Sequence, residues 1–351
     1  MRPLSLELGP LGVRLRPRIA ITVAALALTG FGALVASVSL GTYAIPVGDV
    51  LGALLGTGSG DADLIVHQLR LPRALTALLV GAAFGVAGAV YQAVTRNPLA
   101  SPDLIGISAG AGAGAVAAIV IGGVTAAGAG TFGAVPFGAL AGALATAALI
   151  YVLAWHGGTI TGYRFVLVGI AANGALAALT RWMLARADID QASRAMVWLT
   201  GSLNGRGYDH VRWAGLALLL LVPLTLALAR SYQLLQYDDD TALSLGIPIG
   251  RARIALLVLA TSLAALATAA AGPVAFVALG APQIARRLAG TAGIPLVISG
   301  LTGAVLLLLA DLAARLLFAP TELPVGIITG AVGAPYLLLL LARANRSGKG
   351  G

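Results

Sequence analysis

The sequence has no cysteine and very little charge. Of its 351 residues, 10% are charged and 59% are hydrophobic, and the mean hydropathy is +0.95. Without cysteine there are neither disulfides nor thiolate metal sites. A soluble domain of this size carries charge on about a quarter of its residues, so this composition excludes a soluble globular protein. It favours a polytopic membrane protein.

Histidine is also scarce, and the motifs of catalysis are missing. The three histidines, His67, His156 and His210, do not lie at metal-ligand spacings, and we expect neither a metal site nor a cofactor. No nucleophile–base pair, carboxylate pair or Walker loop occurs, so the chain is expected not to be an enzyme. A membrane-embedded enzyme is therefore the least favoured function. A glycine-rich run after residue 106 mimics a dinucleotide fingerprint but lacks the preceding strand and the following acid.

What the chain does contain is a series of continuous apolar runs, which favours helices over a β-barrel. We predict an all-α fold with about ten transmembrane helices. The runs cover residues 19–40, 74–94, 103–122, 133–154, 165–185, 211–229, 254–270, 273–289, 295–314 and 324–342. A cleaved signal peptide is the alternative for the first run, which is longer than a signal peptide's apolar core. A short interfacial helix is expected at 196–205.

Arginines between the apolar runs indicate the topology. With ten spans, the positive-inside rule places both termini in the cytoplasm. We expect a cytoplasmic segment at 1–18, one transmembrane domain at 19–343 and a cytoplasmic tail at 344–351. The net charge of +9 is then explained by topology and not by nucleic-acid binding. Arg70, Arg73 and Arg315 fall on the outer side, where they either anchor at lipid headgroups or form a basic rim for a docking protein.

A polar stretch begins at Arg96, where Pro98 and Pro102 stop the preceding helix. Ser101, Pro102 and Asp103 predict a new helix start, and the stretch is either a gate on a membrane pathway or a plain turn. The spacing of the glycines that follow predicts a helix face for close packing. These glycines are Gly106, Gly110 and Gly114.

A second polar stretch, at 238–248, begins with three aspartates. The pattern predicts a short helix that is capped by Asp240 and ends at Gly246 and Pro248. The residues that such a helix would present to a soluble partner are Ala242, Leu243 and Leu245. The simpler interpretation is a solvated acidic connector.

Asp311 lies near the end of an apolar run, four residues before Arg315. An acid within the membrane is a functional candidate, although an ion pair with Arg315 in the same helix is the favoured explanation. The alternative function is an ion-coupled carrier that needs no ATPase and uses Asp311 as its ion site.

Six strings resemble the FecCD-type permeases, which are the transmembrane subunits of ABC importers for ferric siderophores, haem and vitamin B12. They are 69–73 (LRLPR), 96–109 (RNPLASPDLIGISA), 198–204 (WLTGSLN), 238–246 (DDDTALSLG), 272–287 (GPVAFVALGAPQIARR) and 322–335 (ELPVGIITGAVGAP). The resemblance covers residues 30–343. It implies a ten-helix permease of the type II importer class, dimerised in the cytoplasmic membrane around a central pathway. An ATP-binding subunit dimer would bind on one side and a periplasmic or lipid-anchored binding protein on the other.

The resemblance also implies roles for single residues. The residues expected to dock the binding protein are Arg70, Arg73 and Arg315. Those expected at the two cytoplasmic gates are Asn97 and Leu99, and Thr159 and Thr161. The loop 233–250 would couple to the ATPase through Asp239, Asp240, Thr241, Ala242, Leu243, Leu245 and Gly246.

One departure from the family pattern bears on the cargo. Where the family commonly has Pro-His before two paired arginines, this chain has Pro282 and Gln283 before Arg286 and Arg287. That string is similar to the ferric-enterobactin-type component, which works beside a second, different permease. It favours a catecholate siderophore and a heterodimer, with vitamin B12 or haem and a homodimer as the alternatives.

Overall fold

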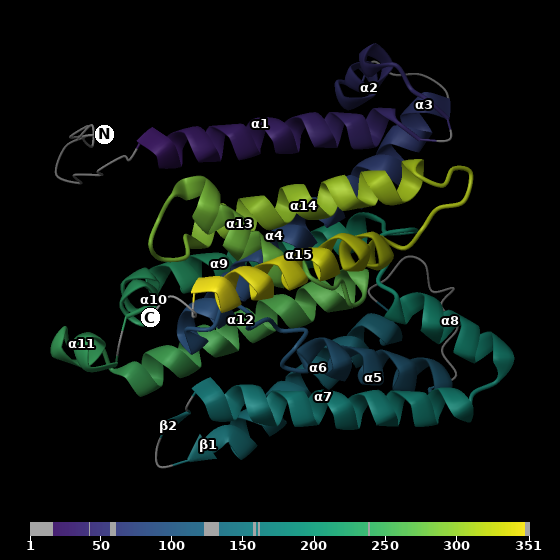
Figure 1. Cartoon of the computed structure of the whole chain (residues 1–351). Helices are drawn as coiled ribbons and strands as arrows, with labels where there is room; N and C mark the ends of the chain where they lie inside the picture. The colour runs from purple at the N-terminus through teal and green to yellow at the C-terminus, as the bar shows by residue number, and fades with distance from the viewer. Residues whose placement is uncertain are drawn as a thin grey trace.

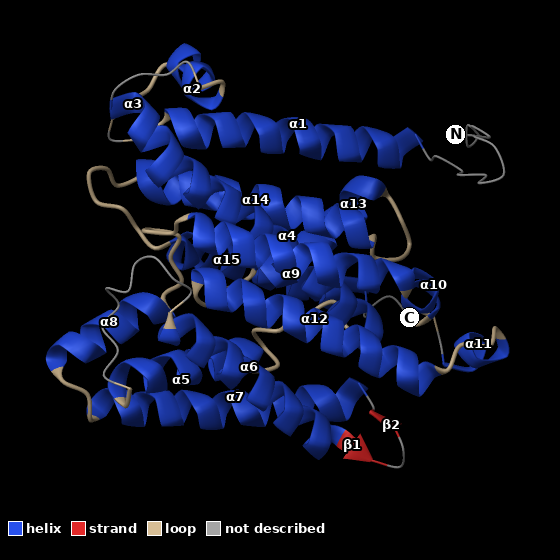
Figure 2. Cartoon of the chain, turned by 180° about the vertical axis from the view of Figure 1, so that it is seen from behind, coloured by secondary structure: helices blue, strands red, loops and turns tan. Residues whose placement is uncertain are grey.

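The chain was analysed as a computed structural model that describes residues 17–41, 43–56, 61–122, 133–156, 159–160, 162–237 and 239–347. The predictions for residues 1–16, Asp238, Thr161 and 348–351 lie outside this part of the chain. The described residues are almost entirely helical (Figure 2). The exception is a hairpin of two-residue strands, β1 (Trp155–His156) and β2 (Thr159–Ile160), paired antiparallel. The predicted all-α class is confirmed.

Ten helices of the described part match the ten predicted runs. They are α1 (Pro17–Ser39), α4 (Leu71–Thr95), α5 (Ile107–Val120), α6 (Ala134–Ala154), α7 (Gly162–Ala185), α9 (Tyr208–Ala227), α12 (Ile249–Ala271), α13 (Val277–Ala289), α14 (Leu296–Leu316) and α15 (Val325–Ser347). Among the described residues, seven helices are long and apolar enough to cross a membrane, and α5 and α15 contribute shorter apolar helices. The chain is therefore a multi-pass membrane bundle.

Short elements gather at the two ends of the bundle (Figure 1). One end, called the α8 end below, holds α2 (Val47–Leu54), α3 (Asp61–Leu64), the π-helix η1 (Ile65–Arg70) and α8 (Ile189–Leu199). The opposite end, called the α11 end, holds α10 (Ala229–Leu234), α11 (Asp239–Ser244) and the hairpin. The helix α1 begins at the α11 end, which places the first described residues there.

Two predicted helix positions are wrong because glycines interrupt them. Residues 101–106 form a single turn, and α5 begins only after Gly106, whose φ is +91°. Ser101 therefore starts no continuous helix, although its carbonyl oxygen accepts the Ile105 N–H at 3.2 Å. The interfacial helix is α8, at 189–199 instead of 196–205, because Gly201 and Gly205 adopt positive φ.

The most buried helix is α4, which contacts α14, α12, α13, α9 and α1. In the helix that ends at Thr95, 78% of the most apolar part is buried, against 17% in α1. Glycines allow this close packing. A Cβ on Gly85 would overlap the carbonyl oxygen of Ser299 in α14, and one on Gly88 would overlap that of Ala278 in α13.

A second glycine contact joins α5 to α6. Gly110 and Gly114 of α5 face Gly138 and Gly142 of α6, so that each helix presents two glycines four residues apart. The predicted close-packing face is confirmed for Gly110 and Gly114. Gly106 instead lies against α7, where its Cβ would be 3.1 Å from the Gly169 carbonyl oxygen.

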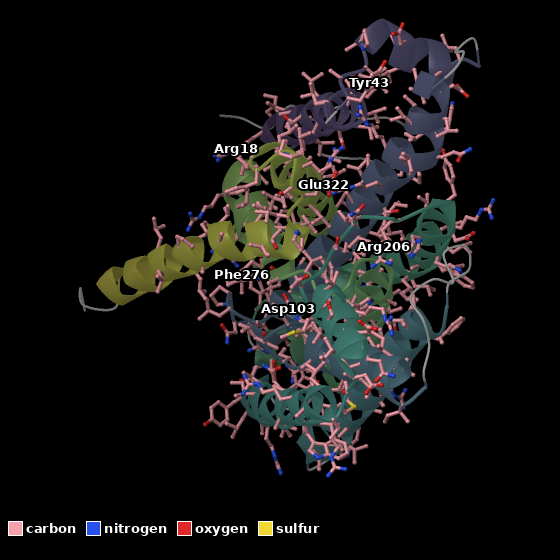
Figure 3. All side chains as sticks on the ribbon, turned by 90° about the vertical axis from the view of Figure 1, so that its right-hand side faces the viewer. Arg18, Tyr43, Asp103, Arg206, Phe276 and Glu322 are labelled. Atoms are coloured by element: carbon pink, nitrogen blue, oxygen red, sulfur yellow. The ribbon has the colours of Figure 1, made fainter. Side chains whose placement is uncertain are left out.

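Arginine side chains tie the poorly buried helix α1 to the bundle. At the α11 end, Arg18 donates hydrogen bonds to the carbonyl oxygens of Arg287 (2.9 Å) and Leu288 (3.0 Å), where α13 ends (Figure 3). These carbonyls have no partner within their own helix, so the guanidinium caps α13. The other end of α1 is held in the same way by two more arginines, described below.

We expect Gly85→Leu to destabilise the purified protein, because the side chain has no space between α4 and α14. The cost of overpacking is about 1–3 kcal/mol or more. The thermal unfolding midpoint in detergent measures it. Gly174→Leu is the matched control, since a Cβ at this α7 glycine meets nothing within 4 Å. Equal midpoints for the two variants would contradict the packing described here.

Candidate functional site

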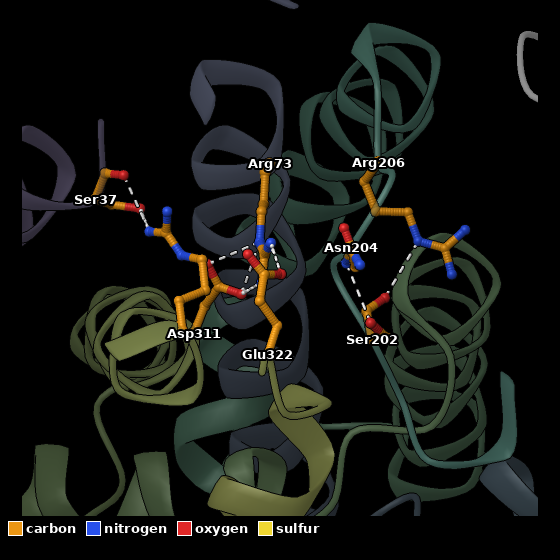
Figure 4. Close-up of polar contacts among 8 residues, drawn as sticks. Ser37, Arg73, Ser202, Asn204, Arg206, Asp311 and Glu322 are labelled. Atoms are coloured by element: carbon orange, nitrogen blue, oxygen red, sulfur yellow. Dashed lines mark hydrogen bonds and ion pairs between the residues drawn. The ribbon is translucent and has the colours of Figure 1, made fainter. Parts of the chain in front are cut away.

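The α8 end holds a buried cluster of charges, in which Arg73 at the start of α4 pairs with two carboxylates (Figure 4). Its guanidinium lies 3.0 Å from Asp311 of α14 and 2.7 Å from Glu322 of the 317–324 segment. Arg315 lies one turn after Asp311, and the two side chains are 3.4 Å apart. The Asp311 side chain is fully buried, whereas that of Glu322 is 36% exposed.

Arg70 and Arg315 hold the end of α1. Arg70 donates to the carbonyl oxygens of Val38 (2.8 Å) and Ser39 (2.9 Å), and also to that of Tyr43. Arg315 donates to the Ser37 carbonyl oxygen at 3.0 Å and to its hydroxyl oxygen at 2.6 Å. The last carbonyls of a helix lack partners and carry partial negative charge, which suits both guanidinium groups.

The expected exposed rim of arginines is not what the structure shows. Arg70, Arg73 and Arg315 are 9%, 8% and 7% exposed, and their side chains bind groups of this chain. Headgroup anchoring does not describe them either. The reason is that the Asp311 and Glu322 carboxylates and the end of α1 lie close to these arginines in space. The order of residues in the sequence does not show this proximity.

The predicted Asp311–Arg315 pair is confirmed, but Asp311 has a second partner, Arg73, which is 238 residues away in the sequence. A carboxylate that binds two guanidinium groups is already neutralised. This arrangement speaks against an ion-coupled carrier with Asp311 as its vacant ion site.

The loop after α4 lies at the α11 end. Its first residue, Arg96, caps α4 with φ +50°, a left-handed conformation that glycine usually supplies. The Asn97 side-chain oxygen accepts the backbone N–H of Leu99 at 2.9 Å. The two predicted gate residues therefore belong to one hydrogen-bonded turn. Further along, Asp103 accepts a hydrogen bond from the Ser108 hydroxyl at 2.5 Å.

The second predicted gate lies at the same end. The strand residue Thr159 pairs with His156 through the backbone, and Figure 1 shows the hairpin at the α11 end. The Thr159 side chain and all of Thr161 lie outside the described part of the structure, so this prediction stays untested.

The predicted short helix at 238–248 exists as α11, whose last residue is Ser244, and Gly246, with φ +79°, follows two residues later. The Leu243 and Leu245 side chains are exposed, at 58% and 48%. Ala242 is fully buried, so its predicted exposure is wrong: it packs into the main hydrophobic core of the bundle. Asp240 lies within the first turn of α11 instead of capping it.

One carboxylate joins α11 to the C-cap of α4 and to α12. Asp239 binds Arg96 of the loop after α4, and it lies 3.1 Å from Arg253 of α12. The Arg96 side chain also donates to the Leu235 carbonyl oxygen at 3.2 Å. The sequence does not reveal Arg96 as a partner of Asp239, because 143 residues separate the two, and no motif singles out Arg253 as the second partner.

A cavity of about 720 Å³ lies beside this contact, between the Arg96 loop, α10 and α13. Gln283, the residue that departs from the family pattern, donates to the Gln92 side-chain oxygen at 2.5 Å. Gln92 in turn donates to the Leu279 carbonyl oxygen at 2.9 Å. The residues that line the cavity include Gln92, Arg96, Gln236, Gln283 and Arg286. Within the described ranges, no three His, Asp or Glu side chains are placed to bind one metal ion.

We expect Asp311→Asn to lower the thermal midpoint strongly, because it leaves the buried Arg315 without its counterion and Arg73 with Glu322 alone. Breaking a buried ion pair costs about 3–5 kcal/mol. The control is Asp209→Asn, which removes an ion pair to Arg212, whose side chain is 76% exposed. A pair of that kind contributes about 0–1 kcal/mol. If both variants unfold at the wild-type temperature, the cluster does not stabilise the bundle.

Comparisons with known proteins agree with this geometry. The chain is similar to the ferric enterobactin transport system permease protein FepG of Escherichia coli (strain K12), at 40% identity over 87% of this chain and 91% of that protein. It is also 40% identical to the iron(3+)-hydroxamate import system permease protein FhuG of Bacillus subtilis (strain 168), over 88% of this chain and 93% of that protein.

A solved structure has the same architecture. It is a metal-chelate type ABC transporter in an inward-facing conformation, with a TM-score of 0.78, 27% identity and coverage of 92% of this chain and 99% of that chain. The model of the FecCD transport family matches residues 26–343, nearly the whole bundle. On this evidence the chain belongs to the FecCD transport family.

Proposed function

We propose that the chain is the membrane-spanning permease of an ABC importer that carries a ferric siderophore, driven by a separate ATP-binding subunit. The observation that carries the proposal is α11. This short helix exposes Leu243 and Leu245 at one end of the bundle and is joined through Asp239 to the loop after α4. Apolar side chains exposed beside charged ones are typical of a protein interface.

The orientation follows from the arginines. Many of them lie at the α11 end, which supports a cytoplasmic location for that end and for both termini. They include Arg18, Arg96, Arg164, Arg230, Arg251, Arg253, Arg286 and Arg287. At the α8 end, Arg73 and Arg315 pair with acids of this chain. These two arginines therefore do not count against the positive-inside rule. In this orientation the ATP-binding subunit dimer docks on α11, and the substrate-binding protein docks at the α8 end.

The mechanism we propose is alternating access. Closure of the ATP-binding subunits moves α11, and the Arg96 loop, with Asn97 and Leu99, follows as a cytoplasmic gate. The hairpin with Thr159 and Thr161 would form a second gate beside it. ATP drives the change because it binds one conformation of the ATPase more tightly than the other. The permease follows the conformational change of the ATPase through α11.

We propose a catecholate siderophore as the cargo and a second, different permease as the partner. The support is the Pro282–Gln283 string, whose amide side chain bonds to Gln92. The two relatives reported above have the same identity and are named for different cargoes, so identity does not decide between them. Vitamin B12 or haem, and a homodimer, are the alternatives. Uptake of ferric catecholate but not ferric hydroxamate, by cells that have no other importer, would support this cargo.

Docking of the binding protein by Arg70, Arg73 and Arg315 requires an exchange of partners, because all three are already bonded. Glu322 is the accessible partner of Arg73, since its side chain is 36% exposed and that of Asp311 is buried. An incoming carboxylate can replace Glu322 without uncovering Asp311. We therefore propose that Arg73 is the arginine that exchanges first.

We expect Glu322→Gln to tighten binding of the importer's own substrate-binding protein and Arg73→Ala to weaken it. The reason is that Glu322 competes with the partner's carboxylate. A tenfold change corresponds to about 1.4 kcal/mol. The dissociation constant in nanodiscs measures both effects, with Asp209→Asn as control. Weaker binding by Glu322→Gln would refute the competition, and unchanged binding by Arg73→Ala would refute docking on Arg73.

We expect the double variant Leu243→Asp, Leu245→Asp to lose the ATP-binding subunits on co-purification, because two carboxylates replace the apolar contact. Leu55→Asp is the control, since Leu55 is 79% exposed at the α8 end. An ion-coupled carrier would transport normally with both α11 substitutions. Full uptake by the double variant would therefore favour the carrier and contradict the importer.

A further inference from the structure

We propose that Asp239 is a positioning residue that ties α11 to the Arg96 loop, so that a displacement of α11 is delivered to Leu99 through the Arg96 side chain. The inference rests on the proposed function, in which α11 receives motion from an ATPase. It adds the residue pair that passes this motion to the permease.

The backbone of Arg96 is the first evidence. A non-glycine residue at φ +50° is strained relative to an ordinary backbone conformation, because its Cβ crowds the following carbonyl oxygen. Glycine occupies such positions after a helix without this strain. In the described part of the chain, Arg96 and Phe276 are the non-glycine residues with positive φ. The side chain of Arg96 must therefore do something that glycine cannot.

The contacts of that side chain are the second evidence. Arg96 donates to the Leu235 carbonyl oxygen, in the segment before α11, and to the carboxylate of Asp239, the first residue of α11. Arg253 of α12 lies 3.1 Å from the same carboxylate. Charge-assisted bonds of this kind are shorter and stronger than neutral ones. The Asp239 carboxylate thus holds the start of α11 between the end of α4 and the base of α12.

The cavity beside the contact is the third evidence. Its lining includes Arg96 and Pro98 of the loop, and Gln236 and Tyr237 of the segment before α11. Empty space of about 720 Å³ means that side chains do not fill the region between the loop and this segment. The Arg96 contacts therefore give a push from α11 a direct route to the loop, beside the packing of Ala242 in the core.

The loop beyond Arg96 is stiff enough to follow. The Asn97 side-chain oxygen binds the Leu99 N–H at 2.9 Å, and the Asn97 carbonyl oxygen accepts the Ala100 N–H at 3.1 Å. Ala100 and Ser101 are buried, at 3% and 1% exposure, so the turn is anchored at its far side. Residues 96–100 consequently move together when Arg96 is displaced.

An ordinary surface ion pair is the competing explanation. The Arg96 and Asp239 side chains are 36% and 46% exposed, so their pairing adds little to stability. The two explanations differ in what a substitution changes. Asp239→Asn should leave the thermal midpoint close to that of the wild type and should break the link between nucleotide binding and the loop.

The absence of cysteine makes the link measurable. In the complete importer in nanodiscs, Leu99→Cys supplies a single thiol on this chain. Its labelling rate with a polar maleimide is compared with and without a non-hydrolysable ATP analogue, in the presence of cysteine-free partner subunits. We expect the analogue to change the rate about fivefold or more, in the range of ordinary allosteric coupling.

The same measurement is made in four further backgrounds. Asp239→Asn and Arg96→Gly should abolish the response to the analogue, and the glycine variant keeps the left-handed backbone while it removes the side chain. Asp239→Glu should restore most of the response. Asp209→Asn is the matched control, because it makes the same substitution in an exposed ion pair, with Arg212, that belongs to no predicted site. It should respond like the parent.

Each outcome decides something. A full response in Asp239→Asn or Arg96→Gly overturns the inference and leaves the proposed function standing. Loss of the ATP-binding subunits from Asp239→Asn on co-purification overturns it too, because Asp239 would then belong to the subunit interface. No response in the parent overturns the proposed function itself, and the inference with it.

Discussion

The fold depends on one electrostatic constraint: a guanidinium group that leaves water must find its acceptors inside the protein, either a carboxylate or the open end of a helix. At each end of the bundle, one carboxylate holds two guanidinium groups. Asp311 holds Arg73 and Arg315 at the α8 end, and Asp239 holds Arg96 and Arg253 at the α11 end. One arginine of each pair belongs to α4 or to its C-cap. The most buried helix of the bundle is thus fixed at both ends by ions of other elements.

The carboxylates of Asp311 and Asp239 differ in their exposure, and this difference separates their roles. Asp311 is buried, so its bonds contribute to a rigid framework in which removal of one charge is costly. The Asp239 side chain is 46% exposed, so its ion pairs rearrange at little cost in free energy. The tight glycine contacts of α4 with α14 and α13 keep the middle of the bundle rigid. Movement is therefore expected at the α11 end, where a cavity separates the elements.

The candidate site was predictable from the sequence only in part. The α11 helix and its end shortly before Gly246 followed from local signals, namely the acids at its start and the glycine after its end. Which face of that helix is buried did not, because six residues carry no clear amphipathic period, and Ala242 turned out to face the bundle. The sequence placed Arg70, Arg73 and Arg315 on the outer side, where the positive-inside rule does not expect arginines. Their burial depends on Glu322 and on the end of α1, which are distant in the sequence.

By itself, the sequence determined that this protein is a helical membrane bundle, with described helices at each of the apolar runs, since length and hydropathy are local properties and lipid leaves few other folds. It also determined the close packing of Gly110 and Gly114, because their spacing is a property of one helix. Only the tertiary structure decided which charges meet. Asp311 meets Arg73 across 238 residues, and Arg96 meets Asp239 across 143. The physical reason is that an ion pair depends on distance in space, which the order of residues along the chain does not record.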